Sequence, residues 1–248
     1  MNQSPPTKLF TLASGKGGVG KTSLTLNLAT QLAKQGQKVL VIDGDTGLAN
    51  ADVQLNLKPE RDLAHYLSGQ FALRHVLTPT PQGFTLIAGR AGHNQLANLP
   101  LPKLHQLLKD LRDLAQSYTI TLIDAAAGVS PTTLAMCAEA NHTLLVTTPD
   151  PSSLTDAYAL IKLLWHNNAT ANSQLIVNQA NAREAAQVHT RLTTAATTFL
   201  GLPPLPLLGN IPQCKHFSQA VRQHHLASTA FPNSPAITAL QTLAKKLA

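Results

Sequence analysis

The chain has 248 residues, which is long enough for one large α/β domain with a substantial core. Only 12% of the residues are charged, but lysine and arginine outnumber aspartate and glutamate by 19 to 12. The net charge of +7 favours acidic partners such as nucleotides, nucleic acids or anionic lipids, although no run of like charges forms a basic arm. Cys137 and Cys214 lie far apart and outside any C-x-x-C motif, which argues against a disulfide framework or a zinc ribbon.

No segment has the pattern of a secretion signal or of a membrane-spanning helix. Residues 1–7 lack an apolar core, and no uninterrupted apolar stretch reaches membrane-spanning length. Together with the cysteine usage, this predicts a protein of the reducing cytoplasm. Peripheral association with the inner face of the membrane is left open.

The apolar residues form patterns that alternate between short strands and helices along the chain. In chain order, strands are predicted at residues 8–13, 38–43, 84–88, 119–124, 143–147, 175–178 and 205–211. Helices are predicted from Thr22 to about Gly36 and at residues 61–77, 101–116, 131–139, 153–166, 184–199, 216–224 and 235–247. This alternation predicts an α/β fold with a mostly parallel, twisted sheet covered by helices on both faces. Pro206 suggests an edge or an irregular start for the last strand. With no linker or internal repeat, residues 1–248 are predicted to form a single domain.

One glycine-rich stretch, residues 14–22, fits the phosphate-binding motif G-x-x-x-x-G-K-[ST] of P-loop proteins. Glycines allow backbone N–H groups to turn inward around phosphate oxygens without a Cβ in the way. Lys21 can then reach the β- and γ-phosphates, and the Thr22 hydroxyl can bind Mg²⁺. A predicted strand before the stretch and a predicted helix after it argue against a chance turn. We therefore predict a P-loop NTPase that binds ATP or ADP with Mg²⁺ through Gly15, Lys16, Gly17, Gly18, Val19, Gly20, Lys21, Thr22 and Ser23.

Three aspartates follow predicted strands, at the end of the sheet where ligands bind in such folds. Asp124 ends one strand and resembles a Walker B aspartate, and Asp43 and Asp45 form a D-x-D pair after another strand. Gly44 between this pair favours a turn, so that the two carboxylates have different tasks. We predict Thr22, Asp43 and Asp124 as the metal site, and Asp45 as the residue that orients the attacking water. The alternative is that these aspartates only cap the following helices.

The position of Lys16 points to a particular family. A second lysine near the start of the loop, in the pattern G-K-G-G-x-G-K-T, resembles the deviant Walker A loop of the MinD/ParA ATPases. The resemblance implies that Lys16 reaches across the interface of an ATP-dependent homodimer to the partner's nucleotide. It implies a catalytic set of Lys16, Lys21 and Asp45. Without the resemblance, Lys16 would be interpreted as a solvated surface lysine.

Longer stretches of the sequence resemble one branch of this family. Residues 43–57 look like switch I of MinD-type proteins. Residues 147–162 and 177–192 are similar to FlhG (FleN), the MinD-like ATPase that controls the number and placement of flagella. The likeness covers about residues 8–247. It implies a dimerisation switch that hydrolyses ATP slowly and acts on a flagellar transcription activator or on basal-body components.

The same resemblance implies a base pocket and also exposes departures from the family. Asn178 would contact adenine, with Pro212 and Gln213 beside the base, although an asparagine at a strand end can simply form a turn. Ala125 replaces a threonine that commonly follows the Walker B aspartate, and Gln213 and Cys214 stand where an acidic residue often follows the proline. The predictions of ATP turnover and of selectivity for adenine are therefore weaker than the prediction of nucleotide binding.

The two ends of the chain also depart from the family. The segment through which some FlhG proteins stimulate the flagellar SRP-type GTPase FlhF is not visible before the first predicted strand, which puts that partnership in doubt. The last helix, 235–247, has an apolar stripe beside two lysines and could lie on anionic lipid. It lacks Trp and Phe, however, and takes the place of a packing helix. We expect it to pack against the domain, with peripheral membrane binding as the alternative.

Two other functions fit the sequence. A MinD-like division-site ATPase or a ParA-like partition ATPase would also dimerise with ATP, and a ParA-like dimer would bind DNA. The diffuse positive charge permits DNA binding, but no clustered basic face or helix-turn-helix is evident, so DNA is not the expected partner. A scaffold that binds nucleotide with little turnover is suggested by Ala125.

Overall fold

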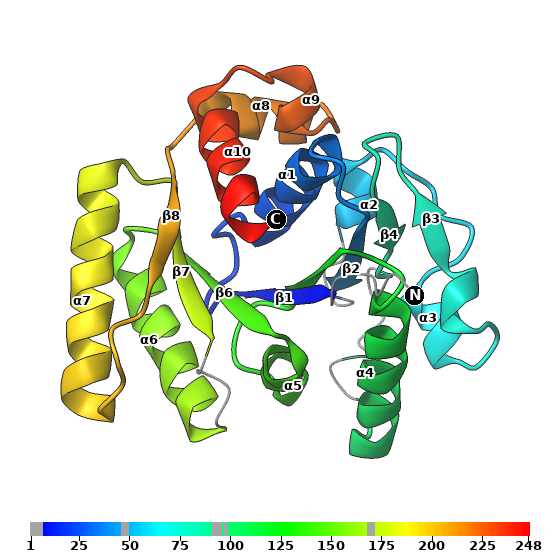
Figure 1. The fold of residues 1–248 in the computed structure, drawn as a ribbon, viewed down its shortest axis with the longest axis horizontal. Coiled ribbons are helices and arrows are strands. Elements are labelled where there is room, and N and C mark those ends of the chain that lie inside the picture. Colours follow the sequence, from blue (N-terminus) through cyan, green and yellow to red (C-terminus); the bar gives the residue numbers. More distant parts are fainter. Residues whose placement is uncertain (1–6, 46–49, 91–95, 97–98, 168–171) are drawn as a thin grey trace, which may run out of the picture.

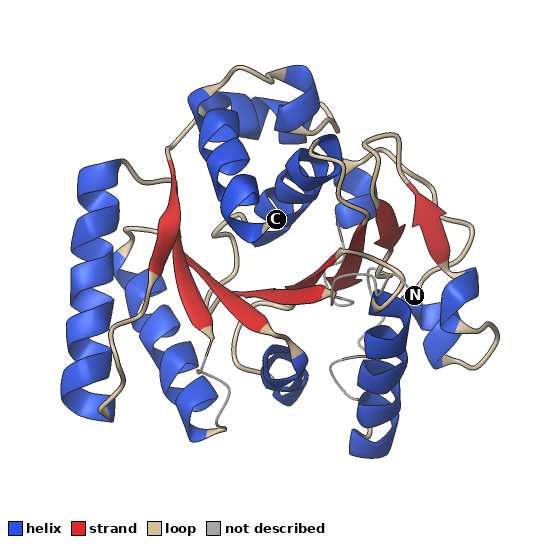
Figure 2. Cartoon of the chain, viewed as in Figure 1, coloured by secondary structure: helices blue, strands red, loops and turns tan. Residues whose placement is uncertain are grey.

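The computed structural model describes residues 7–45, 50–90, 96, 99–167 and 172–248, and these form an eight-stranded sheet between two layers of helices (Figure 1 and Figure 2). The strand order is β3-β4-β2-β5-β1-β6-β7-β8, and every neighbouring pair is parallel except β3 with β4. The prediction of a mostly parallel sheet is therefore confirmed. The strands are β1 (Lys8–Ala13), β2 (Val39–Gly44), β3 (Leu77–Pro79), β4 (Thr85–Ile87), β5 (Ile120–Ala125), β6 (His142–Thr147), β7 (Ser173–Asn178) and β8 (Leu207–Ile211).

Helices cover both faces of the sheet, as predicted (Figure 1). One face carries α1 (Lys21–Lys34), α8 (Lys215–Arg222), α9 (Ala227–Ala230) and α10 (Pro235–Leu247). The other face carries α4 (Leu101–Ala115), α5 (Pro131–Glu139), α6 (Pro151–His166) and α7 (Ala182–Leu200). Between β2 and β4 the chain also forms α2 (Ala51–Gln54), α3 (Leu63–Leu67) and the 3₁₀ helix η1 (Leu73–His75).

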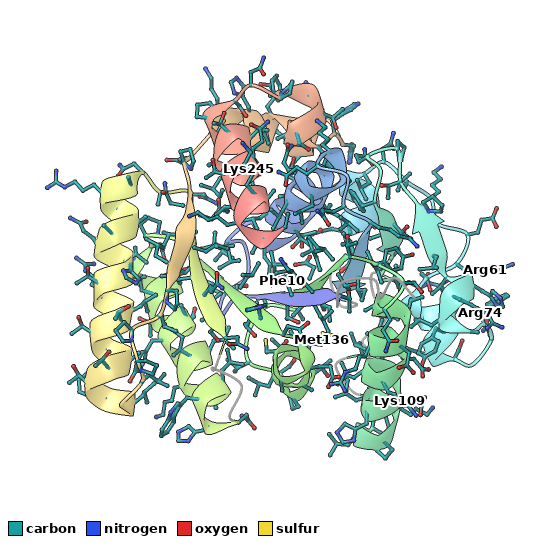
Figure 3. The ribbon with its side chains drawn as sticks, viewed as in Figure 1. Phe10, Arg61, Arg74, Lys109, Met136 and Lys245 are labelled. Atoms are coloured by element: carbon teal, nitrogen blue, oxygen red, sulfur yellow. The ribbon has the colours of Figure 1, made fainter. Side chains whose placement is uncertain are left out.

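The apolar side chains of the central strands alternate between the two faces, as the pleat of a strand requires. In β1, Phe10 and Leu12 belong to the cluster under α1 and α10, whereas Leu9 and Ala13 join clusters on the side of α4 to α7. Figure 3 shows Phe10 and Met136 inside the molecule, between the sheet and the helix layers. Because both faces are covered, each central strand is a nearly continuous apolar run in the sequence. Each fully buried leucine stabilises this arrangement by about 2 kcal/mol.

The predicted helix at residues 61–77 is wrong. The structure has α3 and η1 there, followed by β3, which pairs antiparallel with β4. The Asp62 side chain caps the start of α3, and the chain leaves the helical conformation at Gly69, whose φ is 76°. Leu73 and Val76 are buried as an amphipathic helix would require, but they belong to η1 and its C-cap, which are separate from α3. The periodicity of apolar residues could not distinguish one long helix from several short segments.

The other predicted elements are present, with ends that differ by a few residues. α6 begins at Pro151 rather than at residue 153, because the Asp150 carboxylate accepts hydrogen bonds from the N–H groups of Ser152 and Ser153. Pro206 lies just before β8, which is an edge strand of the sheet, in agreement with the prediction. The short helices α2 and α9 have no counterpart among the predicted elements, since four residues are too few to show a helical period.

The last helix, α10, packs against α1 and β8, as expected. Ile237 and Leu240, on its apolar stripe, are fully buried in the core. Lys246 Nζ donates a hydrogen bond to the Leu208 carbonyl oxygen at 2.6 Å, so one of the two lysines beside the stripe also fastens the helix to β8. The stripe is therefore used inside the domain. Among the helices of the described segments, none combines the length and the apolar composition that crossing a membrane requires.

Candidate nucleotide-binding site

The phosphate loop joins β1 to α1 and is shaped by its glycines. Gly18 and Gly20 have φ angles of 78° and 86°, a left-handed conformation that other residues adopt only with strain. Gly15 lies so close to α6 that an added Cβ would be 2.1 Å from the Asp156 carbonyl oxygen. Gly20 is the N-cap of α1, and within the described parts of the chain no side chain caps the first N–H groups of this helix. The positive end of α1 therefore faces the loop, as an anion site requires.

A cavity of about 240 Å³ lies beside this loop. Residues 16–23 of the predicted binding loop line it, and Asp45, the predicted water-orienting residue, lines it as well. The structure adds Asn50 and Gln54, which lie in the stretch that resembles switch I but were not predicted as site residues. Residues 46–49 of the stretch that resembles switch I lie outside the described residues.

Lys21 and Asp124 form a buried ion pair next to the cavity. Lys21 Nζ lies 2.8 Å from Asp124 Oδ1, and the two side chains are 6% and 2% exposed. Asp124 Oδ2 is buried without a hydrogen-bond partner among the described residues. Because a buried carboxylate oxygen normally has a partner, this atom fits a metal ion or a metal-bound water. Ser130, rather than Asp124, caps α5, so the helix-cap alternative for Asp124 is wrong.

Asp43 lies beside Asp124, because β2 and β5 pair in register at these two residues. Its Oδ1 accepts a hydrogen bond from the Asp45 N–H at 3.2 Å, and its Oδ2 accepts one from the Ala51 N–H at 3.3 Å. Burial, followed by the charge of Asp124, raises the pKa of Asp43 to about 7, against the effect of these hydrogen bonds and of Lys21. The capping alternative is thus partly correct for Asp43, which contacts the first N–H of α2.

These residues fit Mg²⁺ bound together with a nucleotide. Thr22 lines the phosphate cavity, and the paired ends of β2 and β5 bring the carboxylates of Asp43 and Asp124 together. Carboxylate and hydroxyl oxygens are the hard ligands that Mg²⁺ prefers, and two buried carboxylates side by side favour a nearby cation. When bound, Mg²⁺ would neutralise charge on the phosphate oxygens.

A second cavity of about 360 Å³ shares Gly20 and Ser23 with the first. It is lined by all three predicted base-contacting residues, Asn178, Pro212 and Gln213, which the structure brings together from β7 and from the loop after β8. The two cavities therefore stand next to each other as the phosphate and base parts of a nucleotide site would.

Asn178 connects the base cavity to the phosphate loop. Its Nδ2 donates to the Val19 carbonyl oxygen at 2.7 Å, and a Cβ at Gly20 would lie only 2.7 Å from this nitrogen. Its Oδ1 also accepts from the Gln179 N–H, so the turn-forming alternative is partly correct. Phe217 of α8 lines the same cavity, so an aromatic side chain is within the predicted base pocket. Phe217 was not predicted from the sequence. It could have been found as an aromatic residue in the first turn of the helix that follows Pro212.

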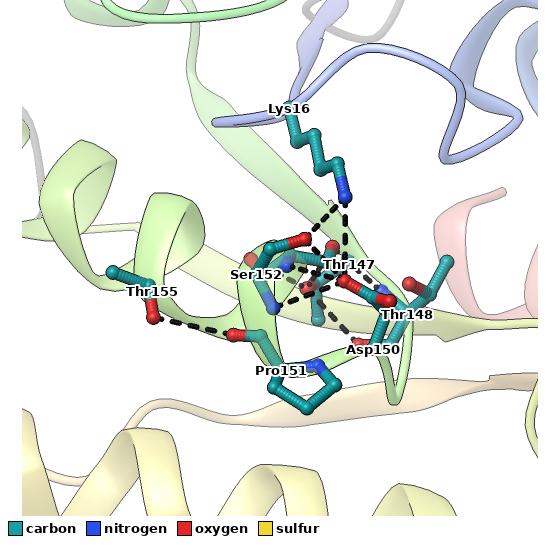
Figure 4. Close-up of polar contacts among 8 residues, drawn as sticks. Lys16, Thr147, Thr148, Asp150, Pro151, Ser152 and Thr155 are labelled. Carbon is teal, nitrogen blue, oxygen red and sulfur yellow. Dashed lines mark hydrogen bonds and ion pairs between the residues drawn. The ribbon is translucent and has the colours of Figure 1, made fainter.

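Lys16, near the start of the loop, is exposed and contacts its own chain (Figure 4). Its Nζ lies 3.3 Å from Asp150 Oδ1 and also contacts Ser152 Oγ. The side chains of Lys16 and Asp150 are 41% and 55% exposed. Hydrogen bonds from the Ser152 hydroxyl, the Ser153 N–H and Lys16 lower the pKa of Asp150 to about 2. The contact of Lys16 with a partner's nucleotide stays a prediction.

Known proteins resemble this chain in sequence and in fold. The family described as the CobQ/CobB/MinD/ParA nucleotide binding domain matches residues 10–227. Antiactivator FleN of Pseudomonas aeruginosa is 34% identical over 248 residues, which cover 100% of this chain and 88% of FleN. The flagellum site-determining protein YlxH of Helicobacter pylori is 34% identical over 228 residues, 92% of this chain and 77% of YlxH. Septum site-determining protein MinD from Pyrococcus horikoshii, complexed with Mg-ADP, matches with a TM-score of 0.79 at 25% identity, over 97% of this chain and 96% of that one. The chain therefore belongs to the CobQ/CobB/MinD/ParA nucleotide-binding family, as its phosphate loop predicted.

Proposed function

We propose that the protein is an ATP-dependent dimerisation switch that hydrolyses ATP slowly and regulates the number or placement of flagella. The observation that carries the proposal is a glycine loop with two different lysines, one buried against Asp124 and one exposed beside Asp150. The names of its relatives, antiactivator FleN and flagellum site-determining protein YlxH, support the flagellar part. The partner proposed is a flagellar transcription activator or a basal-body component.

In the proposed reaction the phosphate cavity binds and orients ATP. The loop N–H groups and Lys21 hold the phosphates, and Thr22 with two carboxylates holds Mg²⁺. Asp45, which lines this cavity, orients the attacking water. The base lies in the second cavity, beside Asn178 and Phe217.

The exposure of Lys16 supports the proposed dimerisation. Its pair with Asp150 is about half exposed to solvent, so exchanging that carboxylate for another anion costs little. In the ATP-bound dimer, Lys16 of each protomer would leave Asp150 and contact the phosphates of the partner. Hydrolysis would remove part of that negative charge and release the two protomers.

Size-exclusion chromatography with light scattering tests the switch, with ATP and Mg²⁺, with ADP and without nucleotide. Asp45→Ala is used to slow hydrolysis and trap the ATP state. We expect a dimer only in the presence of ATP and Mg²⁺. A monomer under all three conditions would refute the proposal. Phosphate release by the wild type and by Lys21→Ala tests the enzyme, because equal rates would favour a scaffold. Counting flagella by electron microscopy after deletion of the gene tests the flagellar part independently.

A further inference from the structure

Gln54 is a buried polar side chain beside the phosphate loop. It is the last residue of α2, is 7% exposed and lines the cavity that Asp45 also lines. Both ends of its carboxamide are hydrogen-bonded. Oε1 accepts from Ser23 Oγ at 2.7 Å, and Nε2 donates to Asn50 Oδ1 at 2.9 Å. Since burying an unpaired carboxamide is costly, these two bonds define where the side chain lies.

The helix that carries Gln54 depends on contacts outside itself. α2 has only four residues, which is too short to be stable alone in water. At its start, the Ala51 N–H donates to Asp43 Oδ2 at 3.3 Å. At its end, Gln54 reaches Ser23 in the first turn of α1. α2 therefore runs from a carboxylate of the proposed metal site to the residue that follows Thr22 of the phosphate loop.

Ser23 is the well-anchored side of this contact. Its carbonyl oxygen accepts a hydrogen bond from Asn27 Nδ2 at 2.7 Å, and Asn27 Oδ1 accepts one from the Ser228 N–H at 2.8 Å. Asn27 is 2% exposed, inside the layer formed by α1 and α9. Ser23 belongs to α1, a helix of 14 residues, and is bonded to Asn27, which is in turn bonded to Ser228 of α9. The Ser23–Gln54 bond therefore positions the short helix α2 on α1 rather than the reverse.

We propose that Gln54 is a positioning residue for the ATPase reaction, an inference that rests on the proposed function. By joining α2 to Ser23, it sets the place of Asn50 in the phosphate cavity and, through Ala51, the orientation of the Asp43 carboxylate. It acts through these neighbours and not on the reacting atoms. A reaction that depends on orientation is slowed strongly by a displacement of about 1 Å.

The variant Gln54→Leu tests this role, because it keeps most of the side-chain volume and removes both hydrogen bonds. Val53→Ala is the matched control, since Val53 lies on the same helix and is 49% exposed. Hydrogen–deuterium exchange of the nucleotide-free protein reports on α2, and we expect its amides to exchange about tenfold faster in Gln54→Leu. Phosphate release against ATP concentration should show kcat about tenfold lower, with KM for ATP within about twofold of wild type. Val53→Ala should match the wild type in both measurements.

Three results would overturn the inference. Unchanged exchange at α2 in Gln54→Leu would show that Gln54 does not hold this helix. Faster exchange with unchanged kcat would show that the helix does not matter for the reaction, and a raised KM alone would assign Gln54 to substrate binding. Asn50→Ala, which removes one of the two bonds of Gln54, serves as a second variant if Gln54→Leu does not fold, and it should also raise the exchange rate of α2 and lower kcat. A wild type that releases no phosphate would refute the proposed function, whereas the exchange measurement would still test the link between Gln54 and α2.

Discussion

The phosphate loop carries one lysine near its start and another at its end, and the two have opposite surroundings. Lys21 is 6% exposed and pairs with Asp124, which is 2% exposed, at 2.8 Å. Lys16 is 41% exposed and pairs at 3.3 Å with Asp150, which is 55% exposed. The first pair lies beside the core of the sheet, whereas the second lies at the surface, where α6 begins.

This difference separates a lysine that needs its partner from one that can exchange it. A buried cation without a counter-ion is strongly unfavourable, so Lys21 requires either Asp124 or phosphate close by. Water and salt screen the pair at the surface, so it contributes little to stability. We therefore expect changes at Lys21 to affect both folding and activity, and changes at Lys16 to affect association and activity alone.

The largest effect is expected for Lys21→Ala. Phosphate release should fall by at least about a hundredfold, because the variant loses the cation that contacts the β- and γ-phosphates. The free energy of unfolding should fall by about 3 to 5 kcal/mol, because Asp124 would be left buried and unpaired. Phosphate release and urea denaturation measure the two effects. Lys21→Ala with Asp124→Asn should regain stability but not activity, and a double variant as unstable as the single one would contradict the ion-pair explanation.

Lys16→Ala should change association without changing stability. We expect the ATP-dependent dimer to be lost in the Asp45→Ala background, and phosphate release in the otherwise wild-type protein to fall about tenfold. The thermal midpoint should stay within about 1 °C of the parent protein, since surface substitutions are usually nearly neutral. Light scattering and thermal denaturation measure these properties. If the variant still dimerises with ATP, Lys16 is not the residue that joins the protomers.

The stability of the protein should also depend on pH through Asp43, which lies at the end of β2 beside Asp124. Its carboxyl pKa is raised to about 7 in the fold, mainly by burial, whereas in the unfolded chain the carboxyl titrates near 3.8. Between these values the folded protein binds the proton more tightly, so the nucleotide-free protein loses stability as the pH rises through this window. Asp43→Asn removes this titration. From pH 5 to pH 8 the thermal midpoint of the wild type should fall relative to the variant by roughly 5 to 10 °C. Parallel pH profiles would show that Asp43 does not titrate in this range.

The smallest effect is expected for Asp150→Asn. The amide oxygen of asparagine can still cap α6, but it no longer attracts Lys16 as a charge does. ATP-dependent dimerisation should become about two- to threefold tighter at low salt, and the difference should vanish in high salt. Light scattering over a concentration series at both ionic strengths measures this. A weaker dimer would mean that Asp150 itself contributes to the interface.

Residues that belong to one continuous motif could be predicted from the sequence. The glycines of the loop need particular backbone angles, and Gly18 and Gly20 have them. Asp43 and Asp124 were found because each ends an apolar run, and parallel strands place such ends side by side. The helix predicted at 61–77 failed, because the apolar spacing of several short segments happened to match a helical period.

What the sequence determined by itself is the kind of ligand and the kind of fold. The P-loop motif and the alternation of apolar patterns depend only on residues that are close in the sequence, so they can be recognised without the tertiary structure. Only the tertiary structure decided which side chains serve the site from elsewhere. Gln54 and Phe217 come from short or distant helices, and Asp150 meets Lys16 only because β6 lies beside β1. Such contacts depend on where strands pair and helices pack, and a polar residue at the end of a short helix carries no local mark of its partner.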